Sequence, residues 1–254
     1  LLEGYDNGTN KDKIDEAVAY GLRARANLLM HNWAEAAKDA EKAIAGGTPQ
    51  SLADVSKPTF NSATADSWLW GVLITPDNDV VQTGIINWPS HLCSLTGNGY
   101  TTLTGSFRYV SSALYDLIPD SDIRKQWFIS PEGTSKLVDN TTVDGIPVID
   151  YFGLTPYANV KFGAYQDIMG NTTNSQDWPL MRVEEMYLIK AEGEAMSNNP
   201  NAKQTLENFV KTYRNPDYTC TASSAQEMQD EIWLQRRMEL WGEGFALFDI
   251  LRLK

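Results

Sequence analysis

Small and apolar residues recur every three or four positions in two neighbouring runs near the start of the chain. The first run consists of Ile14, Ala17, Val18, Gly21, Ala24 and Leu28, and the second of Trp33, Ala36, Ala37, Ala40, Ala43 and Ile44. Because an α-helix turns once about every 3.6 residues, this spacing gathers each run on one helix face. The sequence therefore predicts two amphipathic helices within residues 13–45, joined by a turn at His31-Asn32 and ended by Gly46-Gly47.

The spacing of the small residues in these helices is that of a known repeat. Ala17, Ala24, Ala36 and Ala43, together with Trp33, fall where a tetratricopeptide repeat (TPR) of about 34 residues has its small packing residues and the aromatic of its second helix. The segment resembles one TPR unit. A single unit cannot bury its own apolar face, so at least one further helical pair should pack against it.

A helical period returns late in the chain, in residues 183–195, in residues 206–213 and from residue 228 onward. Asn198-Asn199-Pro200 separates the first two segments, and Asn215-Pro216 ends the second. We interpret residues 179–254 as a degenerate second helical pair followed by a long C-terminal helix.

The intervening residues 46–178 have a different composition. They hold 12 of the 18 glycines, 8 of the 11 prolines and five of the eight tryptophans, with one helix-like stretch at Phe107, Val110, Leu114, Leu117 and Ile118. Such a long irregular region inside a domain is uncommon and, when ordered, is usually functional. We therefore predict a mainly α-helical single domain over residues 1–254, with TPR-like helical pairs, a long loop-rich insertion as the ligand-binding region, and little β-structure.

Composition limits the possible partners. The formal net charge of −12 would repel a phosphate backbone and excludes nucleic acid as an expected partner. No stretch approaches the ~20 apolar residues of a membrane-spanning helix. Cys93 and Cys220 lack the spacing of a redox pair or a zinc site, so two isolated buried thiols are favoured over a disulfide.

Four charged residues near the C-terminus, Glu239, Glu243, Asp249 and Arg252, lie among large apolar side chains. Glu239 continues an apolar helix face, so its carboxylate needs a partner, for which Arg182 or Arg252 is suitable. Asp249 and Arg252 have the i,i+3 spacing of a helical ion pair. A catalytic carboxylate pair is the alternative, but Glu239 and Glu243 are one helical turn apart, as two partners of one arginine would be; structural pairing is therefore favoured.

The segment after these glutamates contains two glycines. Gly242 and Gly244 predict a bend or break in the helix. The break would let Phe245, Phe248 and Leu251 pack on a different surface.

The late helical segments also match a known family in their order and in their residues. The segments that carry this match are RVEEMYLIKAEGEAM, NAKQTLENFVKTYR and LQRRMELWGEGFALFDILR. Over residues 182–252 they resemble the C-terminal helical signature of the SusD/RagB family. YVSSALYDLIPDSDIRKQWF resembles another segment of that family. Gln235 stands where the family usually has Glu, and Ala246 where it usually has Arg. These two differences are consistent with the loss of both partners of one ion pair.

This resemblance implies a function without catalysis. Members of the family are outer-membrane lipoproteins at the cell surface of Bacteroidetes that bind nutrients, typically oligosaccharides, and deliver them to a SusC-like TonB-dependent transporter. The family's contact with the membrane is through a lipid anchor, which this sequence does not include. Members are normally longer, so the resemblance implies that this chain is a portion of such a protein. It implies neither cofactor nor metal.

Candidate ligand-binding residues come from the loop-rich region. A sugar offers apolar C–H faces fringed by hydroxyl groups, which an aromatic ring and nearby polar side chains can hold. Two closely spaced segments carry such groups, the first with Trp88 and His91 and the second with Asn98 and Tyr100. One of Trp68 and Trp70 is expected to lie in the core, and Trp70 is taken as a further candidate. For Trp88 and Tyr100, anchoring of the loop onto the helices is as well supported as ligand contact. Trp127 and Trp178 are expected to pack against other side chains.

Two other functions are compatible with the residues. A TPR-type adaptor would bind a protein segment through exposed residues of the 14–45 helices. A glycoside hydrolase would use loop carboxylates such as Asp77, Asp79 or Asp120, although the sequence has no metalloprotease, nucleophile-elbow or P-loop motif. Asp77-Asn78-Asp79 lacks the later residues of a calcium loop and is interpreted as a turn.

Overall fold

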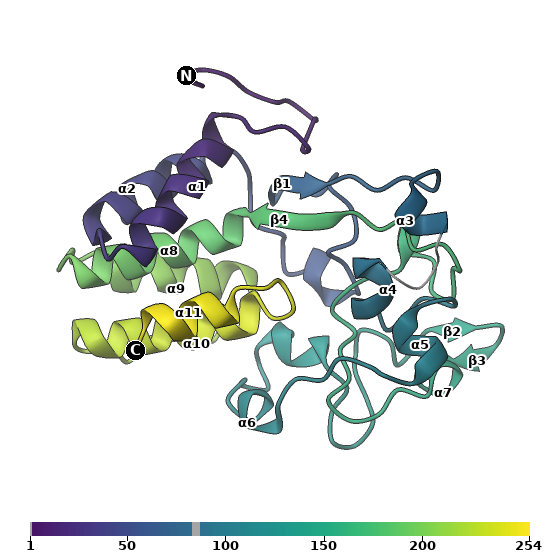
Figure 1. Ribbon diagram of the computed structural model, residues 1–254. Helices are drawn as coiled ribbons and strands as arrows, with labels where there is room; N and C mark the ends of the chain where they lie inside the picture. The colour runs from purple at the N-terminus through teal and green to yellow at the C-terminus, as the bar shows by residue number, and fades with distance from the viewer. Residues whose placement is uncertain (1, 83–86) are drawn as a thin grey trace. The chain divides into compact units, whose positions relative to one another are not determined.

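The computed structural model describes residues 2–82 and 87–254, and the contacts of the chain divide it into two units (Figure 1). The helical unit comprises the residues up to 50, residues 66–71 and residues 179–254. The loop-rich unit comprises residues 51–65 and 72–178. The chain is mainly α-helical with little β-structure, as predicted from the sequence. The grouping of all residues into one domain stays a prediction.

The helical unit is built from two helical pairs, one further long helix and a final short helix. Its helices are α1 (Glu16–Leu29), α2 (Trp33–Ile44), α8 (Val183–Met196), α9 (Ala202–Tyr213), α10 (Ala225–Glu239) and α11 (Ala246–Arg252). Strand β1 (Trp68–Val72) pairs with strand β4 (Trp178–Arg182). Helix α2 packs against α1 and α8, and α8 packs against α9 and α10. The expectation of further helices packed on the TPR-like pair is thus confirmed. None of the described helices combines the length and the apolar character needed to cross a membrane.

The first helical pair begins and turns where the sequence provides suitable residues. Asp15 caps α1 by accepting a hydrogen bond from the backbone N–H of Val18 at 2.8 Å. His31, in the turn between α1 and α2, adopts a left-handed conformation with φ of 59°. Its ring stacks on that of Trp33 with 4.7 Å between ring centroids, so the turn is packed as well as bent.

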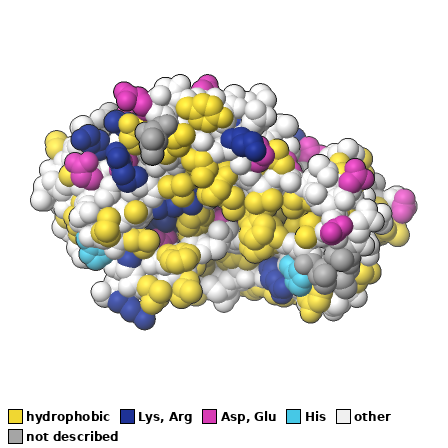
Figure 2. Space-filling view, turned by 45° about the horizontal axis from the view of Figure 1, so that its top comes forward, with side chains coloured by type: hydrophobic (Ala, Val, Ile, Leu, Met, Phe, Trp, Pro, Cys, Tyr) yellow, Lys and Arg dark blue, Asp and Glu magenta, His cyan; other side chains and the backbone are white. Residues whose placement is uncertain are grey.

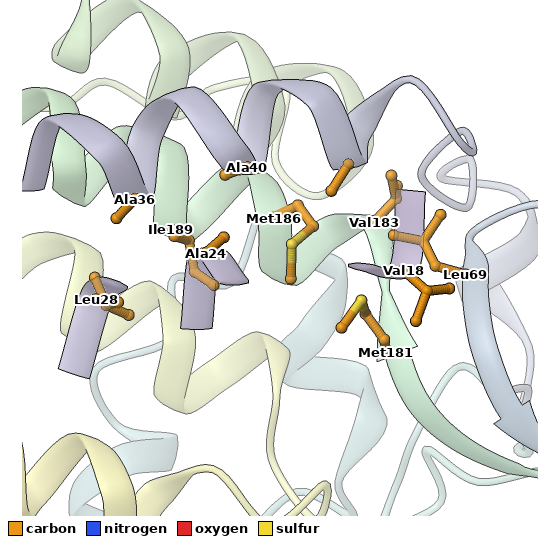
Figure 3. Close-up of a cluster of buried hydrophobic side chains, with 11 residues drawn as sticks. Val18, Ala24, Leu28, Ala36, Ala40, Leu69, Met181, Val183, Met186 and Ile189 are labelled. Atoms are coloured by element: carbon orange, nitrogen blue, oxygen red, sulfur yellow. The ribbon is translucent and has the colours of Figure 1, made fainter. Parts of the chain in front are cut away.

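Two buried clusters hold the helical unit together. Figure 3 shows the first, in which small residues of α1 and α2 face larger side chains of α8 and the two strands. Its members are Val18, Ala24, Leu28, Ala36, Ala40, Ala43, Leu69, Met181, Val183, Met186 and Ile189. The second cluster joins α8, α9 and α10 through residues that include Leu188, Leu206, Phe209 and Ile232.

A glycine sets the separation of α2 and α8. A Cβ atom on Gly193 of α8 would lie 2.5 Å from the backbone oxygen of Trp33 and 2.8 Å from the backbone nitrogen of Ala37. Real Cβ atoms do not approach backbone so closely. The two helices are therefore in near backbone contact at this point, and any larger residue would push them apart.

The loop-rich unit contains short elements connected by ordered turns. These are α3 (Asp79–Gln82), α4 (Trp88–Leu92), α5 (Tyr100–Thr104), α6 (Ser112–Tyr115), α7 (Val148–Phe152), the strands β2 (Thr142–Val143) and β3 (Ile146–Pro147), and 3-10 segments at Asp54–Ser56, Ile123–Trp127 and Tyr165–Asp167. Strands β2 and β3 form an antiparallel hairpin in which Thr142 pairs with Pro147 and Val143 with Ile146.

The structure corrects two expectations for this unit. The stretch from Phe107 to Ile118 was expected to be helical, but only α6 is, because the preceding backbone bonds across to another segment: Val110 N–H donates to the oxygen of Tyr157, and Asn159 N–H donates to the oxygen of Arg108. Trp88 and Tyr100 were expected in loops. Each instead begins a short helix.

The end of the helical unit is partly as expected. Gly242 and Gly244 have φ of 81° and 91°, and they separate α10 from α11 as predicted. The expected packing of Phe248 and Leu251 is wrong, since these side chains are 56% and 57% exposed. The buried side of α11 is its charged one, which carries Asp249 and Arg252. Exposed apolar side chains also gather among charged ones on the face shown in Figure 2.

Cys93 and Cys220 are both free and buried, so the expectation of two isolated thiols is confirmed. Burial raises the pKa of the Cys93 thiol to about 12. The thiol therefore stays protonated at neutral pH.

We expect Gly193→Ala to lower the free energy of unfolding by about 1–3 kcal/mol, because the added methyl group would force α2 and α8 apart. Urea unfolding followed by circular dichroism measures this change. Gly21→Ala is the matched comparison: its methyl group would meet the flexible side-chain end of Met181 rather than backbone. Its loss of stability should be smaller, because the end of a methionine side chain can move aside whereas the backbone opposite Gly193 cannot. Equal losses in the two variants would contradict the role given to Gly193.

Candidate functional site

Buried charges of the helical unit form ion pairs with one another. Arg182 forms ion pairs with three glutamates, Glu184, Glu239 and Glu243. Its Nε and Nη2 atoms donate to the two carboxylate oxygens of Glu243, both at 2.8 Å, and its Nη1 donates to Oε1 of Glu239 at 3.2 Å. The ion pair predicted between Arg182 and Glu239 is confirmed, and Glu243 shares the same guanidinium.

A second arginine that the sequence did not single out completes this cluster. Nε of Arg214 donates to Oε2 of Glu239 at 2.7 Å, and its Nη2 donates to Oε1 of Glu239 at 2.9 Å and to Oε1 of Glu184 at 3.2 Å. Its Nη1 donates to the backbone oxygen of Gln50 at 2.9 Å. We call Arg182, Glu184, Arg214, Glu239 and Glu243 the charge cluster.

A second buried group lies between α8, α10 and α11. Asp249 accepts from Nε of Arg252 and from Nε of Arg236, both at 2.8 Å. The predicted pair between Asp249 and Arg252 is confirmed. Arg252 also donates through Nη2 to Glu192 at 2.8 Å, so its further partner is Glu192 and not Glu239. The sequence did not indicate that Arg236 and Glu192 belong to this group.

The electrostatics of the charge cluster favour a structural role. Burial acts to lower the pKa of Arg182, but Glu243, Glu184 and Glu239 outweigh it and raise that pKa well above its usual value. The carboxylates of the cluster are bound to guanidinium groups by ion pairs and charge-assisted hydrogen bonds. Their oxygens are engaged with the protein itself, which argues against the alternative of a buried catalytic pair.

The candidate ligand-binding residues of the loop-rich unit begin on α4. Asn87 caps this helix, its Oδ1 accepting from the backbone N–H of Ser90 at 3.0 Å. Pro89 occupies the first turn, where it is tolerated. Trp88 and His91 are three residues apart on the same helix, so they share a face.

Each of these two rings is paired with an aromatic ring from another segment. Trp88 stacks on Trp178, with 4.5 Å between ring centroids and 2° between ring planes. His91 stacks on Tyr100, with 4.4 Å and 18°. All four side chains are half-buried. We call Trp88, His91, Tyr100 and Trp178 the aromatic platform.

The backbone beneath the platform is tightly fixed. The hydroxyl of Thr101 in α5 donates to the backbone oxygen of Cys93, just after α4, at 2.7 Å. A Cβ atom on Gly99 would lie 2.5 Å from Cγ2 of Thr96, so this position accepts only glycine without a shift. These contacts hold α5 against α4, and with it Tyr100 against His91.

Asn98 lies two residues before Tyr100, where α5 begins. Its backbone oxygen accepts from the side-chain amide of Asn174 at 2.7 Å, which fixes the loop. Its own half-buried side-chain amide has no hydrogen bond within residues 2–82 and 87–254. An amide in this state can donate to and accept from a bound hydroxyl group.

The remaining tryptophans divide by environment. Trp70 lies on β1 and packs, partly buried, against the core of the helical unit, so it belongs to a different unit from the platform. Trp68 and Trp127 are fully buried, as expected for packing residues. Trp178 was expected to serve packing alone, and the structure places it against Trp88. No local signal relates these two residues, which are 90 positions apart (178 − 88).

The carboxylates proposed for a hydrolase lack the environment of a general acid. Asp77 and Asp79 are exposed. Asp120 accepts a hydrogen bond from Lys125, which lowers the pKa of Asp120, whereas a general acid needs a raised one. Asn78 Oδ1 accepts from the backbone N–H of Thr75 at 2.8 Å, as in a turn. Among the described residues, no group of three or more His, Cys, Asp or Glu is arranged to hold a metal ion.

The model of the SusD family matches residues 111–254. No curated protein matches the sequence. Among solved structures, the chain is similar to a SusD-like carbohydrate binding protein from Bacteroides vulgatus, with 30% identity, a TM-score of 0.74, and coverage of 100% of this chain and 48% of the other.

Two more distant structures share the fold. A SusD superfamily protein from Bacteroides thetaiotaomicron is 19% identical with a TM-score of 0.72, over 99% of this chain and 52% of that one. Surface glycan-binding protein A from the same organism is 17% identical with a TM-score of 0.61, over 98% and 55%. The chain thus spans about half the length of the structures that it matches.

We expect Arg182→Ala to lower the free energy of unfolding by about 3–5 kcal/mol, because it leaves buried carboxylates without their counter-charge. Urea unfolding measures the loss. The control is Lys38→Ala, which removes a cation whose ion pair with Glu35 is solvent-exposed and should change stability little. A similar small change in both variants would contradict a structural role for the cluster.

Proposed function

The chain belongs to the SusD family, and on this premise we propose that it is a non-catalytic protein that binds oligosaccharides or other nutrients. We further propose that it acts at the bacterial cell surface, anchored to the outer membrane by lipid, and passes its ligand to a SusC-like TonB-dependent transporter. The carbohydrate-binding protein from Bacteroides vulgatus, at 30% identity, supports the ligand class. Because this chain spans half of that protein's length, these are properties proposed for the whole protein.

The observation that carries the proposal is the aromatic platform. An aromatic ring offers a flat apolar surface to the C–H face of a sugar, at little entropic cost because the ring is already held. Stacking covers one face of each platform ring. Because each side chain is only half-buried, the part that stays exposed can contact a sugar. This arrangement reconciles the two roles considered for Trp88 and Tyr100, since stacking fixes a ring in the position where it can bind.

Polar groups beside the platform supply the hydrogen bonds that a sugar needs. Asn98 precedes Tyr100 by two residues and carries a side-chain amide, and His91, stacked on Tyr100, carries two ring nitrogens. We therefore propose Trp88, His91, Asn98, Tyr100 and Trp178 as the binding site in this chain. Trp70, on β1 of the helical unit, remains a separate prediction.

The absence of catalysis is also part of the proposal. The buried carboxylates of the helical unit are engaged with arginines, and the pKa of Asp120 is lowered. Both observations favour binding over hydrolysis. Incubation of a bound oligosaccharide with the protein, followed by analysis for shorter products, tests this point directly; appearance of product would favour the hydrolase.

A TPR-type adaptor is the second candidate, and it has one observation in its favour. Leu29 and Met30 at the end of α1 are 48% and 62% exposed, and Phe248 and Leu251 of α11 are exposed as well. Exposed apolar groups of this kind can bind another protein. An adaptor would bind through the helical unit, so substitutions in the platform would leave its binding unchanged.

We expect the protein to bind at least one member of an oligosaccharide panel in calorimetric titration. Trp88→Ala and Tyr100→Ala should weaken that binding about 10-fold each, since loss of one aromatic contact costs on the order of 1 kcal/mol. Tyr151→Ala is the control, because Tyr151 is a 38% exposed aromatic residue of α7 in the same unit but outside the platform.

The folded state of each variant is checked by circular dichroism, and Tyr100→Phe serves as a milder variant that keeps the ring. Equal binding by the parent and both alanine variants would place the sugar elsewhere. Failure of the folded parent to bind any oligosaccharide would overturn the proposed ligand class.

A further inference from the structure

We propose that the ligand of the aromatic platform is an anionic glycan, and that Arg108 is the residue that selects its negative group. The inference rests on the proposed function, because it names the class of sugar that the same site takes. Its basis is the placement of an exposed guanidinium group beside His91, where none of the described carboxylates is its partner.

The position of Arg108 is determined by a buried amide. Asn159 is fully buried, and both its backbone N–H and its side-chain Nδ2 donate to the backbone oxygen of Arg108, at 3.0 and 3.2 Å. The same Nδ2 donates to the backbone oxygen of Leu92, the last residue of α4, at 3.2 Å. One buried side chain thus ties Arg108 to the helix that carries Trp88 and His91.

The side chain of Arg108 approaches the platform itself. Its Nη2 lies 3.5 Å from Nδ1 of His91. A guanidinium group can only donate, so Nδ1 accepts and the ring proton of neutral His91 lies on Nε2. Arg108 therefore holds the His91 ring through Nδ1 and keeps its other N–H groups as donors beside the platform, while the Nε2–H of His91 is a separate donor on the other side of the ring.

No carboxylate in the described part of the chain neutralises this guanidinium. Its other hydrogen bond goes to the backbone oxygen of Ser106 at a long 3.4 Å, and within residues 2–82 and 87–254 it forms no ion pair with a carboxylate. Arg124 of the same unit, by contrast, is bound through two nitrogens to Asp122, at 2.9 and 2.6 Å. The guanidinium of Arg108 is exposed and retains donors for an external partner.

The chemistry of this partner follows from the neighbouring groups. The platform and the amide of Asn98 suit a sugar ring, and a guanidinium fork suits a group with two or more anionic oxygens. A carboxylate or a sulfate ester on the sugar has that form. The chain has a net charge of −12, which repels anions at long range, so attraction must come from a local cation such as Arg108.

Calorimetric titration with two matched ligand pairs tests the inference. One pair is oligogalacturonate and its methyl ester; the other is a sulfated oligosaccharide and its desulfated form. We expect at least one anionic member to bind about 10-fold or more tightly than its neutral counterpart, as a charge-assisted hydrogen bond would give. The pair that shows the preference identifies the carboxylate or the sulfate as the group recognised.

Arg108→Gln should remove this preference, weakening the anionic ligand about 10-fold while changing the neutral one little. Arg108→Lys should retain part of it. Lys136→Gln, which removes one positive charge from an exposed lysine of the same unit, is the control for general electrostatics and should have little effect.

The outcomes separate the inference from the function on which it rests. Binding of neutral and anionic members with equal affinity, or equal losses in Arg108→Gln and Lys136→Gln, would overturn the role of Arg108 and leave sugar binding intact. Binding of none of the four ligands, nor of any neutral oligosaccharide of the wider panel, would overturn the proposed function itself.

Discussion

The charge cluster is the interaction on which the helical unit depends. Arg182 closes β4, Glu184 lies in α8, Arg214 follows α9 and Glu239 ends α10, so one group of buried charges joins four elements. Removing charges from water is costly, and the cost is offset only when every partner is in place. A shift of any of these helices by one residue would leave a buried charge unpaired. The cluster therefore fixes the register of the helices, whereas the apolar clusters beside it only require that the helices be close.

The helices of this unit were predictable because their signals are local. The spacing of Ala24, Ala36 and Ala43 gives the helix face directly, and the glycines at 242 and 244 mark the break before α11. Partners in the charge cluster were only partly predictable. A buried Glu239 signals that an arginine must exist, but Arg182 and Arg214 are equally compatible with that need, and the structure uses both. In the loop-rich unit, local signals misled: the helical spacing from Phe107 onward was overridden where residues 108–110 bond to residues 157–159.

The candidate site shows the same limit. Trp88, His91 and Tyr100 lie close in the sequence, among glycines and a proline, and could be identified as a group. Their long-range partners could not. Trp178 pairs with Trp88 across 90 positions (178 − 88), and Arg108 owes its place to Asn159, a residue with no distinguishing sequence context. A platform of stacked rings is a product of tertiary structure, because only the fold decides which ring lies over which.

The arginines of this chain serve two different purposes, and burial decides between them. A buried guanidinium such as that of Arg214 must be neutralised by the protein, and its bonds are used entirely in holding the fold. An exposed guanidinium is hydrated and needs no internal partner, so its donors remain for a ligand at only the cost of displacing water. In a chain with 33 acidic residues against 21 basic ones, carboxylates are abundant partners. Among the described residues Arg108 pairs with none of these carboxylates, so its donors stay available for the anionic ligand that we propose for the platform.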